Sequence, residues 1–264
     1  MKEYKGSTKT VDTESSFINN MYKGGFKPTN FVNAQNDKDR RMGEFKFYDP
    51  DAVCKDLYKS LYALYHNRDL PNGKQFSLGK EPNKCYFEIS DSNNCRVSSD
   101  YIGPSTTSAY HAKIADEIVG KTILECRIIG GHTLWPKHKC SINQSRGLSL
   151  SDRIDLTLAE LKDFYQYPNN DNYLYSKVLR NAFNYDKDWL MQFFKFEEFC
   201  DFFFFTGSFV DVQYNIKFLA PVQKESYYRP VDYVSFMKEN EKCIKKRTVM
   251  IERFLSKIKL FKAN

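Results

Sequence analysis

The sequence predicts a single α+β domain, with a central, mostly antiparallel sheet packed by helices from the C-terminal half. Short apolar segments separated by Gly and Asn clusters, a pattern typical of antiparallel strands, fall within residues 75–150 and 208–220. Apolar residues at three- and four-residue spacing, typical of amphipathic helices, dominate from residue 151 onward. The 264 residues suffice for one large core, which we assign to residues 45–264 behind a polar lead-in at residues 1–44.

The first helix is expected after the Asp-Pro pair at 49–50, because aspartate caps a helix N-terminus and proline fits its first turn. Leu57, Leu61 and Leu64 give this helix one apolar face. The helix ends before Leu70–Gly73 (LPNG), which predicts a turn because its residues fix or permit unusual φ values.

Short strands and a double glycine are expected next. The sequence favours strands at residues 75–78, 85–89, 96–99 and 122–129, with a short helix at 114–119. Gly130 and Gly131 permit either a close approach of the backbone to a neighbour or a tight turn, and we favour the turn. A phosphate-binding loop would need GxGxxG or GxxxxGK[ST], and neither pattern is present.

Three further helices are expected in the C-terminal half. Ser151 or Asp152 is expected to cap the first, and the others are expected at residues 173–183 and 188–205. The last of these contains eight phenylalanines, and Lys195 is the one basic residue among them, alongside Glu197, Glu198 and Asp201. A surface that stacks nucleic-acid bases would alternate exposed rings with several basic residues. This segment does not, so we expect its phenylalanines to be buried in the core.

A strand at residues 210–219 and a long basic helix after Pro230 are expected to end the chain. The apolar stripe of this terminal helix consists of Met237, Ile244, Ile251 and Ile258. Of the net charge of +7, residues 238–264 contribute +6, from nine basic and three acidic side chains. A positive surface of this kind attracts nucleic acid or an acidic protein, and its candidate residues are Lys242, Lys245, Lys246 and Arg247.

Composition excludes several classes of protein. No run of 18 apolar residues exists and the N-terminus is polar, so we expect neither a membrane span nor a secretory signal. The seven cysteines are odd in number and form no CxxC pair, which favours reduced thiols in a cytoplasmic protein over disulfides or a zinc site. His132 and His138 with Cys140 fit a metal site poorly, so no metal is predicted.

Polar side chains concentrate between the double glycine and the following helix. The group consists of His132, Asn143, Gln144, Arg146, Asp152, Arg153 and Asp155. Arginine offers a planar fork for phosphate, Asn and Gln offer donors and an acceptor, and His132 or Asp155 suits proton transfer. The structural alternative, which the sequence leaves open, is that Arg146 or Arg153 pairs with Asp152 or Asp155. His138, flanked by lysines, is interpreted as a surface or hydrogen-bonded histidine.

Five motifs occur in the order LPNG (70–73), IGGHTLWP (129–136), SINQSRG (141–147), DRIDLTLAE (152–160) and DFFF (201–204). Together they resemble a family of uncharacterised bacterial proteins that carries LPNG, IGGxxxFP, SINQxRG, DRxDLTLE and DFFFL, and the resemblance covers residues 45–220. Trp135 replaces the family's Phe and Ala159 its Glu, which argues against a catalytic role for that glutamate, although Glu160 is adjacent. The resemblance implies a shared fold and site without naming a reaction.

We therefore expect a cytoplasmic protein that binds a phosphate-bearing ligand, either a nucleotide or nucleic acid, in a central polar pocket. One alternative is an NAD-using enzyme that transfers ADP-ribose, with Arg127, His132, Thr133, the Ser98-Ser99 pair and Glu160 as its parts. Another is an inhibitor or interaction protein of a phage or mobile element that acts through the basic terminal helix. These patterns assign no cofactor and no reaction.

Overall fold

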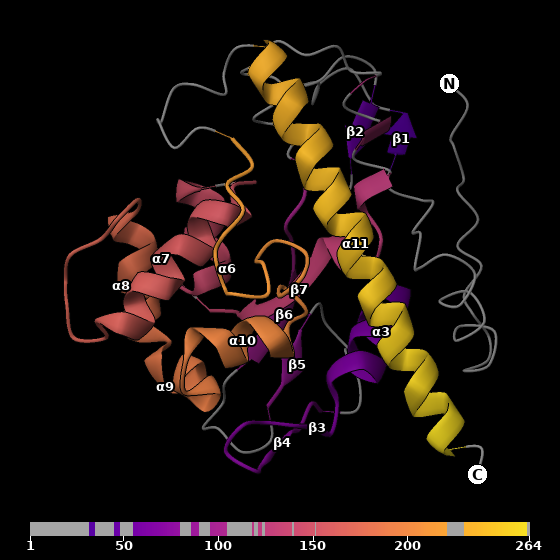
Figure 1. Ribbon diagram of the computed structural model, residues 1–264, viewed down its shortest axis with the longest axis vertical. Coiled ribbons are helices and arrows are strands. Elements are labelled where there is room, and N and C mark those ends of the chain that lie inside the picture. The colour runs from indigo at the N-terminus through magenta and orange to yellow at the C-terminus, as the bar shows by residue number, and fades with distance from the viewer. Residues whose placement is uncertain are drawn as a thin grey trace. The chain divides into compact units, whose positions relative to one another are not determined.

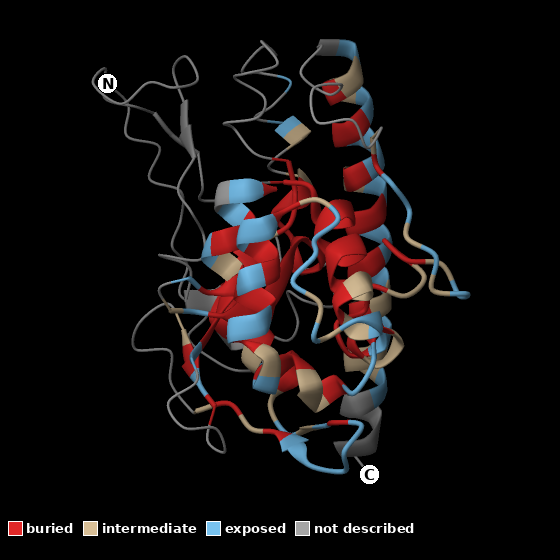
Figure 2. Cartoon of the chain, turned by 90° about the vertical axis from the view of Figure 1, so that its left-hand side faces the viewer, coloured by how far each residue is buried: buried red, intermediate tan, exposed pale blue. Residues whose placement is uncertain are grey.

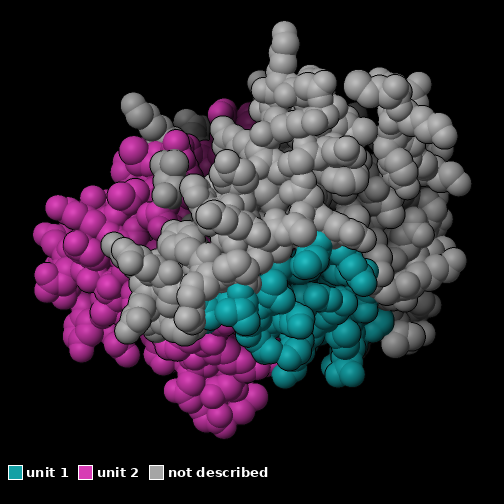
Figure 3. Space-filling model, turned by 90° about the horizontal axis from the view of Figure 1, so that it is seen from above, with its two compact units in different colours: residues 1–61, 103–132, 220–264 teal, residues 62–102, 133–219 magenta. Residues whose placement is uncertain are grey.

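The computed structural model describes residues 32–34, 45–47, 55–79, 86–89, 96–104, 118, 121–122, 125–138, 140–150, 152–220 and 230–262. Helices and small sheets both occur among them, so the fold belongs to the α+β class (Figure 1). Contacts within the chain divide it into unit 1 (residues 1–61, 103–132 and 220–264) and unit 2 (residues 62–102 and 133–219), which Figure 3 colours separately. Most of the expected lead-in and the expected helix cap at 49–50 lie outside the described residues.

Unit 1 contains a two-stranded antiparallel sheet of β1 (Val32–Ala34) and β2 (Phe45–Phe47). Helix α3 (Lys55–Tyr65) begins in this unit and continues into unit 2, with its predicted leucines buried. The strand predicted at 122–129 is wrong, because residues 121–122 and 125–126 are helical and a 3₁₀ turn, η2 (Ile129–Gly131), follows. A short apolar run without alternation does not distinguish a buried strand from a buried helix, which explains the error.

Helix α11 (Pro230–Lys262) confirms the expected long terminal helix. Met237, Ile244 and Ile251 are at most 1% exposed, whereas much of the remaining surface of the helix is exposed (Figure 2). Two turns of helix span ~7 residues, so a seven-residue spacing keeps these side chains on one face. The side chain of Ile258 lies outside the described residues.

The double glycine marks the contact between η2 and α11. The Gly130 amide donates to Oγ1 of Thr248 at 3.1 Å, and Nη1 of Arg247 donates to the carbonyl oxygens of Gly130 and His132, each at 2.7 Å. The two roles that the sequence suggested for Gly130 and Gly131, a tight turn and a close approach of the backbone to a neighbour, are therefore both present. The chain turns tightly at η2, and its backbone also comes close to a helix.

Unit 2 begins with a hairpin of β3 (Arg68–Asp69) and β4 (Gln75–Phe76). The predicted turn at LPNG is confirmed, since the amide of Leu70 donates to the carbonyl of Lys74 at 2.7 Å. Gly73 has a φ of +79°, a value that glycine adopts with little strain.

A three-stranded sheet has the order β5 (Phe87–Glu88), β6 (Arg96–Tyr101) and β7 (His132–Pro136), and all of its residues except His132 belong to unit 2. β5 and β6 are antiparallel, which confirms the strands expected at 85–89 and 96–99. The sheet is smaller than predicted, because residues 142–149 are helical.

Residues 210–219 do not form the predicted strand. Val210 and Ile216 meet only in an isolated bridge. Between them, Oδ1 of Asp211 accepts hydrogen bonds from the amides of Gln213 and Asn215, each at 2.8 Å. This local turn replaces the pairing that the alternating pattern suggested.

Helices make up most of the rest of unit 2: α6 (Ile142–Ser149), α7 (Ile154–Gln166), α8 (Lys177–Tyr185), α9 (Lys187–Leu190), the 3₁₀ turn η3 (Met191–Phe193) and α10 (Phe196–Phe202). Ser141 and Ser176 cap α6 and α8, because their side chains accept from backbone amides of the first turn. The cap position of α7 is Arg153 and shows no side-chain cap, so the expectation that Ser151 or Asp152 caps this helix is wrong.

The phenylalanine-rich segment is core, as predicted, but it is not one helix. Seven of its eight phenylalanines are at most 8% exposed, and Phe194 is 58% exposed. Phe194 has a φ of +52° and Lys195 is extended, so the chain breaks between η3 and α10. Helical geometry requires a negative φ, and the break allows rings from both sides to pack together.

Candidate functional site

Arg146, predicted as a phosphate ligand, instead joins α6 to β6. Its Nε and Nη2 donate to the two carboxylate oxygens of Asp100, Nη2 at 2.8 Å, and Nη2 also donates to the carbonyl of Tyr101 at 2.7 Å. The Arg146 side chain is 4% exposed and that of Asp100 is 11% exposed. The guanidinium is enclosed in a structural ion pair, so the predicted contact with phosphate is not supported.

Arg153 and Asp155 form a second structural pair, as the structural alternative proposed. Nε and Nη2 of Arg153 donate to the two carboxylate oxygens of Asp155 at 2.9 and 2.8 Å. Asp155 also accepts from the amide of Leu219 at 2.9 Å and is completely buried. This carboxylate holds the segment after α10 against α7, a use that opposes the predicted proton transfer. Asp152 is 1% exposed and is likewise enclosed.

His132 and Arg247 belong to unit 1, and both are completely buried. Arg247 was predicted on an exposed basic surface, and this is wrong because its guanidinium donates to the carbonyls beside η2. The buried guanidinium is satisfied by these backbone carbonyl oxygens, which the hydrogen bonds of the short 3₁₀ turn itself do not use. The predicted proton-transfer role of His132 would require access for a ligand, which complete burial does not provide.

Glu160, the acidic residue of the ADP-ribose alternative, is also enclosed. Its Oε2 accepts from the amides of Leu174, Tyr175 and Ser176 at 3.0, 2.7 and 3.2 Å. Arg180 lies 3.9 Å away, and neither side chain is exposed. The carboxylate organises the start of α8. The other residues of that alternative, Ser98, Ser99, Arg127, His132 and Thr133, are at most 8% exposed.

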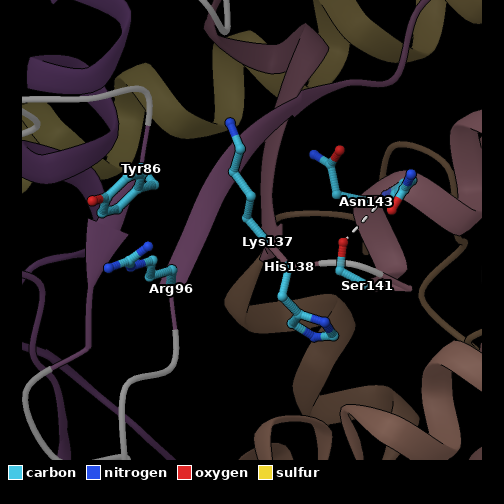
Figure 4. Close-up of a pocket in the computed structure, with 7 residues that line it drawn as sticks. Tyr86, Arg96, Lys137, His138, Ser141 and Asn143 are labelled. Carbon is cyan, nitrogen blue, oxygen red and sulfur yellow. Dashed lines mark hydrogen bonds between the residues drawn. The ribbon is translucent and has the colours of Figure 1, made fainter.

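A pocket of about 420 Å³ opens beside the N-terminus of α6 (Figure 4). We call it the α6 pocket, and its lining residues are Tyr86, Arg96, Lys137, His138, Ser141, Asn143 and Gln144. Asn143 and Gln144, which the sequence analysis named as ligand-binding residues, both line this cavity. Asn143 Nδ2 donates to the carbonyl of Ser99 at 3.2 Å, which orients the amide. Among the described residues that line this cavity there is no carboxylate.

Two cationic residues that line the α6 pocket, Arg96 and Lys137, were not among the predicted site residues. Arg96 begins β6 and Lys137 follows β7, and the Lys137 amide donates to the Arg96 carbonyl at 2.8 Å. In Figure 4 the side chains of Lys137 and His138 leave the backbone in opposite directions. The guanidinium of Arg96 lies 4.6 Å from the centre of the Tyr86 ring. Arg96 and Lys137 come together only because β6 and the end of β7 lie side by side. The hydrophobic pattern of the sequence does not specify the register of two strands that are far apart along the chain, so this pair of cations could not be predicted from it.

Asp186 fixes both His138 and the start of α6. Its Oδ1 lies 2.6 Å from Nε2 of His138, and its Oδ2 accepts from the amide of Ile142 at 3.1 Å. Burial raises the pKa of the Asp186 carboxyl, while the hydrogen bond with His138 opposes that shift. The His138 ring also packs against Tyr185, with ring centres 4.6 Å apart. His138 is thus a hydrogen-bonded histidine, as interpreted, and it lies at a cavity.

The basic surface of α11 is partly neutralised. Lys242, with 71% of its side chain exposed, pairs with Glu239. Lys245 pairs with Glu241 and Glu125, and Lys246 is exposed. Glu239 and Glu241 are already counted in the +6 of residues 238–264, so of these three carboxylates only Glu125 lowers the local positive charge below that count.

Two classes of feature are absent from the part of the chain that the structure describes. It contains no cluster of three or more His, Cys, Asp or Glu side chains arranged to hold a metal ion. Within the same residues, every helix is too short or too polar to span a bilayer.

Comparison with known proteins places the chain in a family without extending the site. No curated protein and no solved structure matches it. A family model does match, over residues 29–251, and this range includes all five motifs and every residue of the α6 pocket. The chain therefore belongs to the family of unknown function DUF6994.

Proposed function

We propose that this protein binds a phosphate-bearing ligand, a nucleotide or nucleic acid, in the α6 pocket. The observation that carries the proposal is the charge of the lining: Arg96 and Lys137 approach one cavity that no described carboxylate lines. Arginine and lysine both bind phosphate, arginine as a planar fork and lysine as a point charge.

The surroundings of the two cations support an anionic ligand. Nη2 of Arg96 lies 3.8 Å from Oε1 of Glu88, and both side chains are at least 50% exposed. An exposed pair at that distance contributes little and is readily replaced by a phosphate. Asn143 and Gln144 add neutral donors that orient a bound group.

The N-terminus of α6 contributes less than its position suggests. The amide of Ile142 donates to Asp186 and the amide of Gln144 donates to Ser141. Two first-turn donors are therefore occupied within the protein. The side-chain cations, rather than the helix terminus, provide the attraction. The volume of about 420 Å³ fits one nucleotide-sized group, since pockets for small ligands enclose roughly 300–1,000 Å³.

The test is a calorimetric titration of the full chain with AMP, ATP and pyrophosphate at low ionic strength. Arg96→Gln and Lys137→Glu should each weaken binding by roughly 10-fold or more, the effect of losing one charge-assisted hydrogen bond. Lys242→Glu is the matched control, because that lysine is exposed on α11 and remote in sequence from the pocket lining. The affinity of the Lys242→Glu variant for these ligands should stay near that of the wild type.

Two results would overturn the proposal. One is the absence of measurable binding of any of these three ligands to the folded wild type. The other is binding that Lys242→Glu weakens and the pocket variants leave unchanged, which would move the site to α11 and favour the interaction-protein alternative.

A further inference from the structure

We infer that the ligand of the α6 pocket is single-stranded nucleic acid, whose bases stack on Tyr86 and Tyr185. This inference rests on the proposed function and narrows it. A simple phosphate site needs cations, whereas a single-strand site also needs flat apolar surfaces for unpaired bases. The pocket and its margin supply both.

The first surface is Tyr185 at the end of α8. This residue is 70% exposed, and its ring packs against that of His138 with centres 4.6 Å apart and planes 36° apart. His138 itself lines the pocket and is anchored by Asp186. Tyr185 is therefore an exposed ring that packs against a side chain of the pocket lining.

The second surface is Tyr86, within the pocket lining beside β5. The guanidinium of Arg96 lies over this ring at 4.6 Å from its centre. Arg96 and Lys137 are joined through the backbone hydrogen bond between their strands. One aromatic side chain is thus held against one cation, and a second cation, Lys137, lines the same pocket. This alternation of rings and positive charges is typical of proteins that bind single strands without reading their sequence.

A single exposed tyrosine would carry no such argument, because isolated apolar side chains are common on protein surfaces. Here Tyr86 lines the cavity and packs against Arg96, and Tyr185 packs against His138, which also lines it. A duplex hides the faces of its bases, so stacking on these rings requires unpaired nucleotides. A mononucleotide offers one base and leaves one of the two rings unused.

The expected salt dependence follows from the cations. Each neutralised phosphate of a single strand contributes about −0.7 to the slope of log K against log salt, so two cations predict a slope of about −1.4. Lys137→Gln should reduce the steepness by about 0.7. Tyr185→Ala should lower affinity and leave the slope unchanged, because stacking releases no counterion.

The experiment measures fluorescence anisotropy of a labelled 12-nucleotide single strand of mixed sequence, as RNA and as DNA, with the full chain. Unlabelled duplex of the same sequence and AMP serve as competitors. Tyr185→Ala and Tyr86→Ala should each weaken single-strand binding by roughly 5- to 150-fold, the effect of one lost stacking contact. Tyr185→Phe retains the ring and should bind like the wild type. Tyr173→Ala is the control, since Tyr173 is 50% exposed and does not line the pocket.

The outcomes separate this inference from the proposed function. Duplex that competes as well as the single strand, or tyrosine variants that bind normally while Lys137→Gln does not, would refute stacking and leave a phosphate site in place. Failure of the folded wild type to bind both AMP and the single strand would refute both. Selective loss in Tyr86→Ala and Tyr185→Ala supports the inference.

Discussion

The substitution Gly130→Ala should test how tightly η2 packs against α11. A Cβ atom added at this position would lie 2.3 Å from Oγ1 of Thr248, 2.4 Å from the carbonyl oxygen of Ile244 and 2.7 Å from the Thr248 amide nitrogen. Two of these three atoms belong to the backbone of α11. A change of rotamer therefore cannot relieve the overlap, and the helix or the turn has to move.

The size of the effect follows from these distances. Ordinary contact with a Cβ begins near 3.4 Å, so the backbones must separate by roughly 1 Å. Overpacking of a core typically costs ~1–3 kcal/mol. The same movement strains the hydrogen bonds of Gly130 with Thr248 and Arg247, each worth ~1 kcal/mol. We expect the free energy of unfolding to fall by about 3 kcal/mol.

The assay is urea unfolding of the full chain, combined with amide hydrogen exchange of α11. Gly147→Ala is the control, because nothing lies within 4 Å of a Cβ at that helical position, and alanine there should be neutral or stabilise by ~0.5–1 kcal/mol. The double variant with Thr248→Ala should recover only part of the loss, since the contact with the Ile244 carbonyl remains. If Gly130→Ala unfolds at the same urea concentration as Gly147→Ala, the reasoning about close approach is wrong.

Three further predictions concern unit 2. Arg146→Ala should lower the free energy of unfolding by ~3–5 kcal/mol in urea, because it removes the buried guanidinium that pairs with the Asp100 carboxylate. A loss below ~1 kcal/mol would contradict the structural role of the pair. Phe194→Gly should raise the stability by ~1 kcal/mol in the same assay, because this exposed residue has a φ of +52°; a loss would show that the ring contributes. Burial raises the pKa of the Asp186 carboxyl in the folded chain above its value in the unfolded chain. The folded chain therefore binds this proton more tightly, and the resulting stabilisation is complete below the pKa of the unfolded chain and is lost as the pH rises through the pKa of the folded chain. The stability of the wild type relative to Asp186→Asn should therefore fall across that pH window, and a constant difference would count against the shift.

Elements with a strong local signal were predicted correctly. The seven-residue spacing of α11, the LPNG turn and the burial of the phenylalanines each depend on neighbours in sequence or on the cost of exposing rings. The errors have a common origin in apolar runs whose partners are distant. Residues 122–129 and 210–219 carry the composition of strands, but tertiary contacts and the turn at Asp211 decide their conformation.

The candidate site was predicted only in part, because sequence shows which polar groups are present and not which of them face one another. Asn143 and Gln144 line the α6 pocket, whereas Arg146 and Arg153 are consumed by carboxylates. Asp100, the partner of Arg146, is 46 residues away in sequence. No spacing rule connects those two positions, and the structural alternative could name only nearby acids as partners.

The Arg146–Asp100 pair and the α6 pocket involve the same helix and strand. The Arg146–Asp100 pair and the Asn143–Ser99 hydrogen bond both hold α6 against β6, and Asp186 holds the start of the same helix beside His138. Since β6 begins with Arg96, these contacts set the position of the cation relative to the amides of α6. A buried ion pair gains little net stability over an apolar pair of similar shape, but it fixes orientation through directional hydrogen bonds. Of the arginines predicted to bind phosphate, Arg146 thus positions α6 against β6, and the cations that line the pocket are Arg96 and Lys137 beside the strand ends.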